Sequence, residues 1–238
     1  MRTLSLLVPL IALAAVLPAS AAVKTEIVEY KDGDQVCEGF LAYDDAAKGK
    51  RPGVVVVHEW MGLGDYAKGR ATKLAELGYV AFAADIYGKG IRAKDAKEAG
   101  ALAGKFKGDL PLLRSRAKAA FDTLAKNGRV DTAKIFAIGY CFGGTTALEL
   151  ARSGAPVAGV VSFHGGDDPY VPPEQVQAFW DEMKKARVDY QLVVYGGAVH
   201  SFTSPEAGND PSKGAAYDEK ADKRSWEAMK AFFAELFR

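Results

Sequence analysis

A glycine-rich turn between a predicted strand and a predicted helix constrains this chain more than any other feature. Residues 134–138 form a largely apolar run, residues 139–144 read Gly-Tyr-Cys-Phe-Gly-Gly, and residues 145–151 are apolar and rich in alanine. A strand that turns sharply into a helix strains the backbone of its central residue, and flanking glycines remove side chains that would clash there. The pattern therefore predicts a tight bend with Cys141 at its apex. The N–H groups at the start of the helix face the sulfur and favour a negative charge on it.

Strand-like and helix-like segments alternate along most of the chain. Alternating apolar residues predict an N-terminal hairpin, and the β-branched run 53–57 is typical of a strand buried on both faces of a parallel sheet. Strands are predicted at residues 23–30, 36–43, 53–57, 79–84, 135–138, 157–163 and 190–195, and helices at residues 65–77, 93–106, 112–126, 145–151, 173–186 and 212–236, the last as one helix or two. The alternation predicts an α/β fold, with a mostly parallel sheet, an antiparallel N-terminal edge and helices on both faces.

Residues 1–21 have the pattern of a secretory signal peptide. Arg2 gives a positive start, residues 4–17 are almost wholly apolar, and small residues at Ala19 and Ala21 form a cleavage signature. The alternative is an N-terminal membrane anchor, but the apolar run is short for a span and a cleavage site follows it. We therefore expect residues 22–238 to form a single domain, periplasmic or secreted, without membrane contact once the signal is removed.

Composition excludes several classes of partner. The 31 basic and 30 acidic residues leave a formal net charge of +1 and form no basic stripe, so we expect no nucleic-acid partner. Cys37 and Cys141 are the only cysteines, too few for a disulfide scaffold, although a single bridge between them in an oxidising compartment stays open. We expect a monomer that needs no metal and no cofactor.

Polar residues follow the predicted strands at the points where the strands end. In open parallel sheets, sites lie beyond the carboxyl ends of the strands, so these residues are expected along one edge. They are His58-Glu59-Trp60, Asp85-Ile86-Tyr87, Cys141, His164 with Asp167-Asp168, and His200.

A cysteine on such a bend can act as a nucleophile if a histidine takes its proton and an acid orients the histidine. In this arrangement the acid and the histidine follow the nucleophile along the chain. His58 precedes Cys141, and no acidic strand exit separates Cys141 from His164. His200 satisfies the order, with Asp167 or Asp168 as the acid.

Such chemistry also needs donors for the oxygen that becomes negatively charged. In this architecture they are the backbone N–H after the nucleophile and one from the loop after an early strand. In this chain they would be the N–H groups of Phe142 and Trp60.

The same residues resemble those of the dienelactone hydrolase family, from about Val23 to Phe237. The resemblance rests on the segments His58-Glu59-Trp60-x-Gly62, Asp85-Ile86-Tyr87, Gly139-Tyr140-Cys141-Phe142-Gly143-Gly144, Asp167-Asp168-Pro169-Tyr170-Val171-Pro172 and Gly197-Ala198-Val199-His200-Ser201-Phe202. It implies an α/β-hydrolase fold and a triad of Cys141, Asp168 and His200, with Asp168 preferred over Asp167. It also implies that Glu59 hydrogen-bonds the resting thiol until substrate displaces it.

Two features depart from the family pattern. Members that act on a carboxylated lactone hold the carboxylate with two arginines, and here Lys89 and Ser204 stand at those positions. A lysine pairs with a carboxylate only as a point charge. Substrate contacts are still expected from Tyr87, Lys89 and Phe202.

The second departure is a missing segment. Family members have another helix and strand before the acid loop, whereas Gly166 here runs directly into Asp167. We therefore expect a sheet one strand short, with the geometry between Asp168 and His200 at risk.

The function predicted from these features is hydrolysis of a small ester or lactone through a cysteine nucleophile. The alternative is a catalytically weakened or inactive binding protein that kept the pocket. A thiol redox protein is a third hypothesis, disfavoured because the chain has no C-x-x-C pair.

Overall fold

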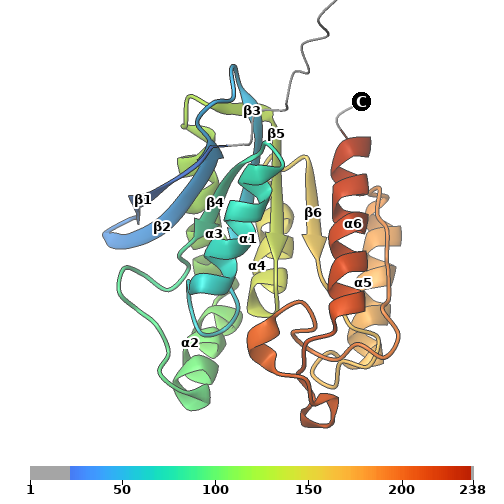
Figure 1. The fold of residues 1–238 in the computed structure, drawn as a ribbon. Coiled ribbons are helices and arrows are strands. Elements are labelled where there is room, and N and C mark those ends of the chain that lie inside the picture. The colour runs from blue at the N-terminus through green and yellow to red at the C-terminus, as the bar shows by residue number, and fades with distance from the viewer. Residues whose placement is uncertain (1–21, 237–238) are drawn as a thin grey trace, which may run out of the picture.

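Six strands form one mixed sheet in the computed structural model, which describes residues 22–236 (Figure 1). The predicted signal peptide lies outside the described residues. The strands are β1 (Val23–Asp32), β2 (Gln35–Asp44), β3 (Arg51–Val57), β4 (Val80–Ala84), β5 (Val130–Gly139) and β6 (Gly159–Ser162), in the spatial order β1-β2-β4-β3-β5-β6. The β1–β2 and β2–β4 pairs are antiparallel and the other three pairs are parallel. The predicted mostly parallel sheet with an antiparallel N-terminal edge is confirmed.

Helices cover both faces of this sheet. They are α1 (Asp65–Glu76), α2 (Ala96–Gly108), α3 (Leu110–Ala125), α4 (Phe142–Arg152), α5 (Pro173–Ala186) and α6 (Glu219–Glu235), with short 3-10 turns at Pro205–Ala207 and Pro211–Lys213. Helices α1 and α6 lie on the near face in Figure 1, and α3 and α4 lie behind the sheet. None of the described helices is long and apolar enough to cross a membrane.

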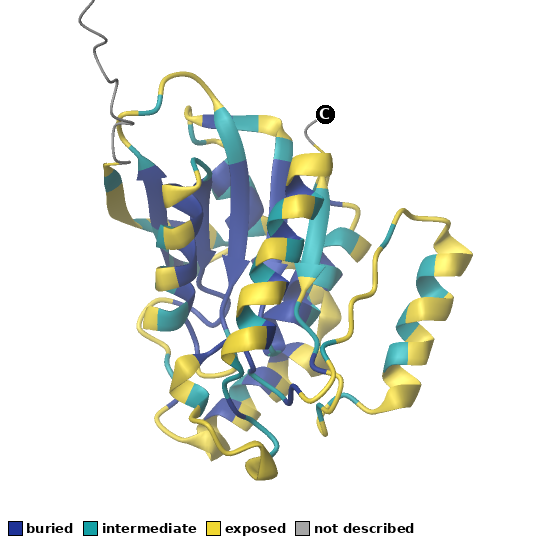
Figure 2. Ribbon diagram, turned by 45° about the vertical axis from the view of Figure 1, so that its right-hand side comes forward, coloured by how far each residue is buried: buried dark blue, intermediate teal, exposed yellow. Residues whose placement is uncertain are grey.

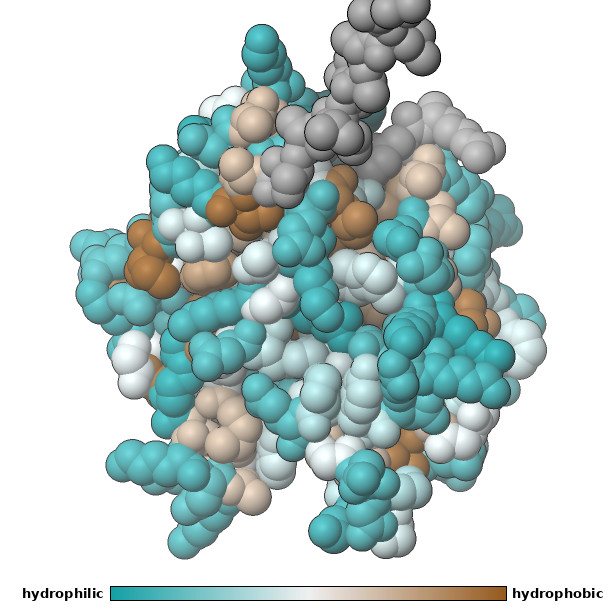
Figure 3. Space-filling model, viewed as in Figure 1, coloured by the Kyte–Doolittle hydropathy of each residue, from teal (hydrophilic) through white to brown (hydrophobic). Residues whose placement is uncertain are grey.

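The central strand β3 supplies both halves of the core. Its residues 53–57 are all buried, and successive side chains point to opposite faces. Val54 and Val56 pack in the cluster that includes residues of α1 and α6, whereas Val55 and Val57 pack in the cluster with residues of α2, α3 and α4. The buried strands are the dark centre of Figure 2, and the outer surface over α1 and α6 is mainly hydrophilic in Figure 3.

Residues 190–195, predicted as a strand, do not form one. The segment makes a single isolated bridge, between Gly165 and Tyr195. The sheet ends at β6, no strand lies between β6 and α5 in the sequence, and the segment does not pair with the free edge of β6. Helix α5 stands outside the sheet, and none of its residues is buried (Figure 2). Without the expected strand, this edge of the molecule consists of an unpaired segment and a helix with no buried residue.

The bend at Cys141 has the strained geometry that the sequence predicts. Cys141 has φ 55° and ψ −120°, a conformation that non-glycine residues rarely adopt. A Cβ added to Gly139 would lie 1.9 Å from the carbonyl oxygen of Gly143, and one added to Gly143 would lie 2.4 Å from that of Val57. Both contacts involve backbone, so neither can relax by a side-chain rotation.

Gly139→Ala is expected to lower the free energy of unfolding by about 3 kcal/mol or more, because its methyl group overpacks the bend against backbone. Gly100→Ala is the matched control, since Gly100 is exposed in α2 and an added Cβ meets nothing within 4 Å. The control should gain about 0.5–1 kcal/mol from helix propensity. Urea denaturation measures both changes, and equal stabilities would contradict the steric argument.

Candidate active site

Three side chains from distant parts of the chain meet beyond the carboxyl ends of the strands. Nδ1 of His200 lies 2.7 Å from Oδ2 of Asp168, and Cys141 is near enough to the same ring to contribute to raising its pKa. Since Nδ1 is engaged by Asp168, Nε2 is the ring nitrogen left for the sulfur. The structure therefore brings together Cys141, Asp168 and His200. Asp168, not Asp167, is the acid beside the histidine.

Two glycine-containing loops make this meeting possible without the missing strand. The N–H of Gly166 donates to the carbonyl of Tyr195 at 2.9 Å, and the N–H of Asp167 donates to that of Ala198 at 3.0 Å. A Cβ on Gly165 would lie only 2.4 Å from the Ala198 oxygen, so the two backbones approach as closely as glycine permits. These contacts fix the acid loop directly against the histidine loop.

The electrostatics of the pair favour a charged imidazole. Burial alone would lower the pKa of His200, but its hydrogen bonds to Asp168 and Cys141 and the negative charges there raise the pKa to about 10. Burial would raise the pKa of Asp168, yet the hydrogen bond and charge of His200 hold that pKa below its ordinary value. The tyrosine ring of Tyr170 covers the imidazole edge-on, with centroids 5.2 Å apart.

The two backbone N–H groups expected to hold a substrate oxygen belong to Phe142 and Trp60. Phe142 is the first residue of α4, and Trp60 lies in the loop after β3. Among the described residues, neither N–H has a hydrogen-bond acceptor.

Two aromatic side chains, those of His58 and Tyr87, hold the loop that carries Trp60. His58 Nδ1 lies 2.5 Å from the carbonyl of Glu59, and Nε2 accepts from the N–H of Ile86 at 3.2 Å. Burial lowers the pKa of His58 to about 4, so the ring stays neutral and donates from Nδ1. Tyr87 is buried, and its hydroxyl donates to the carbonyl of Trp60 at 2.8 Å. The structure thus places Tyr87 beneath the loop, where it positions Trp60.

Glu59 lies in the same hollow as Cys141 and His200. Its Oε1 accepts a hydrogen bond from the Ser201 hydroxyl at 2.9 Å, and burial raises the pKa of its carboxyl group. In this state the Glu59 carboxylate is hydrogen-bonded to Ser201, and none of the described hydrogen bonds joins it to the sulfur of Cys141.

The other residues expected to contact substrate lie in different parts of the structure. Phe202 lines the hollow. Lys89 does not line it, because the lysine ammonium pairs with Glu29 and Glu38 on the N-terminal hairpin. Ser204 is buried. Within the described part of the chain, no three or more His, Cys, Asp or Glu side chains gather to form a metal site.

Sequence reasoning missed Arg70, which anchors the histidine loop. This buried α1 residue donates from Nη2 to the carbonyl of Thr203 at 2.6 Å and to Asp222 of α6 at 2.5 Å. Tyr66, one turn earlier, donates to the Thr203 hydroxyl at 2.7 Å. The available signal was a charge within the apolar stripe of α1, between Ala67 and Ala71 and before Leu74.

Comparison with known proteins assigns this geometry to a family. The sequence profile of the dienelactone hydrolase family matches residues 37–167 and 164–237. The chain belongs to the dienelactone hydrolase family. A crystal structure of a dienelactone hydrolase-like promiscuous phosphotriesterase from metagenomic libraries is 42% identical, with a TM-score of 0.85, over 90% of this chain and 98% of its own.

Two curated proteins are also similar in sequence to this chain. A Yersinia pestis protein, provisionally named a carboxymethylenebutenolidase, is 25% identical over 236 residues, covering 85% of each chain. An uncharacterized Caenorhabditis elegans protein is 34% identical over 149 residues, covering 52% of this chain and 94% of its own length. This dienelactone hydrolase-like protein is a hydrolase of esters or lactones, and the α/β-hydrolase fold implied by the resemblance is confirmed.

The His200 interactions predict a pH-dependent contribution to stability. His200 keeps its proton in the folded protein until pH approaches 10, whereas an ordinary histidine loses it near 6.5. The stabilisation is therefore fully present below 6.5 and is lost as pH rises through the folded value. Chemical denaturation should show the stability advantage of the natural protein over His200→Gln shrinking between about pH 6 and pH 10. A constant advantage would contradict the assigned interactions.

Tyr87→Phe tests the support of the Trp60 loop. Losing one buried hydrogen bond should lower the free energy of unfolding by about 1 kcal/mol. Misplacement of the Trp60 peptide should lower kcat for ester hydrolysis roughly tenfold, with little change in KM. Tyr43→Phe is the control, because it removes a hydroxyl that bonds Glu26 on the distant hairpin and should leave kcat unchanged.

Proposed function

We propose that this hydrolase cleaves small, uncharged esters or lactones through a thioester on Cys141. The observation that carries the proposal is the meeting of Asp168, His200 and Cys141 in one hollow, with an acid–imidazole distance of 2.7 Å. Asp168 engages Nδ1 of the ring, which leaves Nε2 as the nitrogen available to the sulfur.

In the first half-reaction the thiolate attacks the carbonyl carbon and a carbon–sulfur bond forms. The carbonyl oxygen takes the negative charge, and the free N–H groups of Trp60 and Phe142 hold it. When the tetrahedral species collapses, the carbon–oxygen bond to the leaving group breaks. His200 gives its Nε2 proton to the departing alkoxide, which leaves as an alcohol.

In the second half-reaction His200 acts as a base. It takes a proton from water, and the resulting hydroxide adds to the thioester carbonyl. The carbon–sulfur bond then breaks, the acid leaves, and the thiolate returns to its partner imidazolium. Glu59 would move when substrate enters, because its carboxylate shares the hollow with the sulfur.

The preference for uncharged substrates follows from what lines the hollow. Glu59 and Asp168 contribute carboxylates, and no lysine or arginine lies among its described lining residues. A carboxylated lactone would meet these charges with only the His200 imidazolium as a cation, and Asp168 already pairs with that ring. The predicted export of the chain would bring the enzyme to esters or lactones outside the cytoplasm, and we retain that localisation as part of the proposal.

Cys141→Ala should reduce hydrolysis of p-nitrophenyl acetate by at least about a thousandfold, because no other group can form the thioester. Mass spectrometry of the natural protein during turnover should show one acetyl group on the peptide that contains Cys141. Cys37→Ala is the matched control: Cys37 is buried beside Arg116 and should be dispensable for turnover.

Hydrolysis that survives Cys141→Ala would overturn the assignment of the nucleophile. If the natural protein instead binds esters saturably without turnover, and Cys141→Ser binds them equally well, the chain is a binding protein that kept the pocket.

A further inference from the structure

The hollow beside Cys141 is too small to hold a whole ester. Its free volume is about 20 Å³, which is little more than the space that one water molecule occupies. The larger part of a substrate must therefore lie outside the hollow, against the side chains at its rim. Exposed side chains next to Cys141 and His200 are thus the groups that can choose between substrates.

Tyr170 is an exposed aromatic residue directly beside His200. The centroids of the two rings are 5.2 Å apart and their planes meet at 81°, yet Tyr170 is 61% exposed. Residues 169–173 carry no charge, and the three prolines among them are exposed. A large ring that stays open to solvent next to a reacting group offers an apolar surface to a substrate.

The Asp168 carboxylate fixes Tyr170 and His200 relative to each other. Its Oδ2 lies 2.7 Å from Nδ1 of His200, and its Oδ1 accepts a hydrogen bond from the backbone N–H of Tyr170 at 2.8 Å. The far end of the tyrosine ring reaches Gly214, where an added Cβ would lie 3.1 Å from the Tyr170 hydroxyl oxygen. The carbonyl of Gly214 in turn accepts a hydrogen bond from the N–H of His200 at 3.2 Å. The tyrosine ring therefore has a fixed place beside the imidazole.

We propose that the ring of Tyr170 binds the leaving group of the substrate and that the site favours esters of aromatic alcohols, an inference that rests on the proposed function. When the carbon–oxygen bond breaks, the leaving oxygen keeps the bonding electrons and takes the Nε2 proton of His200. That oxygen must then lie within about 3 Å of Nε2. The group that it carries starts beside the ring that packs against His200. An aryl group can pack there edge-to-face or offset against Tyr170.

The acyl group occupies a different place from the leaving group. It is the part of the ester that stays on Cys141 after the alcohol has left, and the sulfur lines the small hollow together with Phe202. The volume of the hollow limits the acyl group to a few atoms. The leaving group has no such limit, because Tyr170 faces solvent. The site therefore combines a small acyl group with a large, flat and apolar leaving group.

Two acetates test this role, because they leave the same acetyl group on Cys141 and differ only in the alcohol released. Phenyl acetate has an aromatic leaving group, and hexafluoroisopropyl acetate has a non-aromatic one of similar acidity. Tyr170→Ala removes the ring but keeps the backbone N–H that donates to Asp168. It should lower kcat/KM about five- to tenfold for phenyl acetate and less than about twofold for the fluorinated ester. Tyr170→Phe keeps the ring and should retain kcat/KM for phenyl acetate within about twofold.

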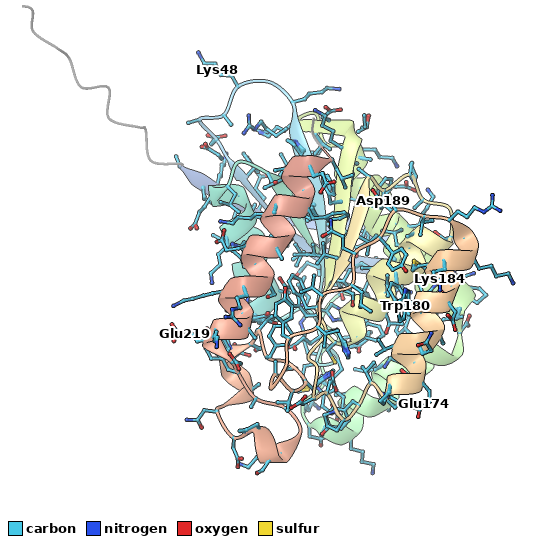
Figure 4. All side chains as sticks on the ribbon, turned by 90° about the vertical axis from the view of Figure 1, so that its right-hand side faces the viewer. Lys48, Glu174, Trp180, Lys184, Asp189 and Glu219 are labelled. Atoms are coloured by element: carbon cyan, nitrogen blue, oxygen red, sulfur yellow. The ribbon has the colours of Figure 1, made fainter. Side chains whose placement is uncertain are left out.

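Trp180→Ala is the matched control, because it removes an exposed aromatic ring that does not line the hollow. Trp180 lies on α5 with the Lys184 ammonium 5.4 Å from its ring centroid (Figure 4), and its loss should leave kcat/KM for both esters unchanged.

Equal losses on the two esters in Tyr170→Ala, or no loss on either, would overturn the leaving-group role while the proposed function stands. Equal losses would show that Tyr170 only positions His200, which serves both esters alike. Turnover of neither ester by the natural protein would overturn the proposed function together with this inference.

Discussion

The contact between the loop at Gly165-Gly166 and the loop that leads to His200 is the constraint on which the site depends. It replaces a strand that would otherwise carry the acid to the edge of the sheet, and backbone hydrogen bonds of 2.9 and 3.0 Å fix it. Because a Cβ on Gly165 would meet backbone, only glycine permits so short a separation. The acid–imidazole pair therefore keeps hydrogen-bonding distance although the sheet ends at β6.

The nucleophile and the oxyanion donors depend on a different set of contacts, centred on β3. Gly143 packs against the backbone at the end of β3. This contact places the bend at Cys141 next to the loop that carries Trp60. The neutral ring of His58 and the hydroxyl of Tyr87 then hold that loop. The two histidines differ in charge because their surroundings differ. His200 is charged and has an acid and a thiol beside it, whereas His58 is neutral because it is buried among peptide groups.

Most of the fold and the pairing of Cys141 with His200 could be predicted from strand exits and from the order of residues along the chain, whereas the choice of Asp168 over Asp167 came from the family resemblance. The failure at residues 190–195 has a clear cause: apolar alternation reports a tendency to form a strand, but a strand also needs a neighbour, and sequence alone does not supply one. Lys89 was similarly ambiguous, since its distance along the chain from Glu29 hides the ion pair between them. Arg70 escaped notice because its partners lie in two segments far along the chain.

Arg70 also has a consequence for how this enzyme tolerates change. One guanidinium joins the first helix of the domain, the loop after the histidine and the last helix, so that loop cannot loosen while both helices stay docked. Geometry at the reacting sulfur is thus coupled to a carboxylate on α6 that no substrate touches. A substitution at Asp222 would therefore affect turnover as well as folding. Selection for catalysis then also acts on Asp222, although this residue is remote in sequence from the residues that carry the chemistry.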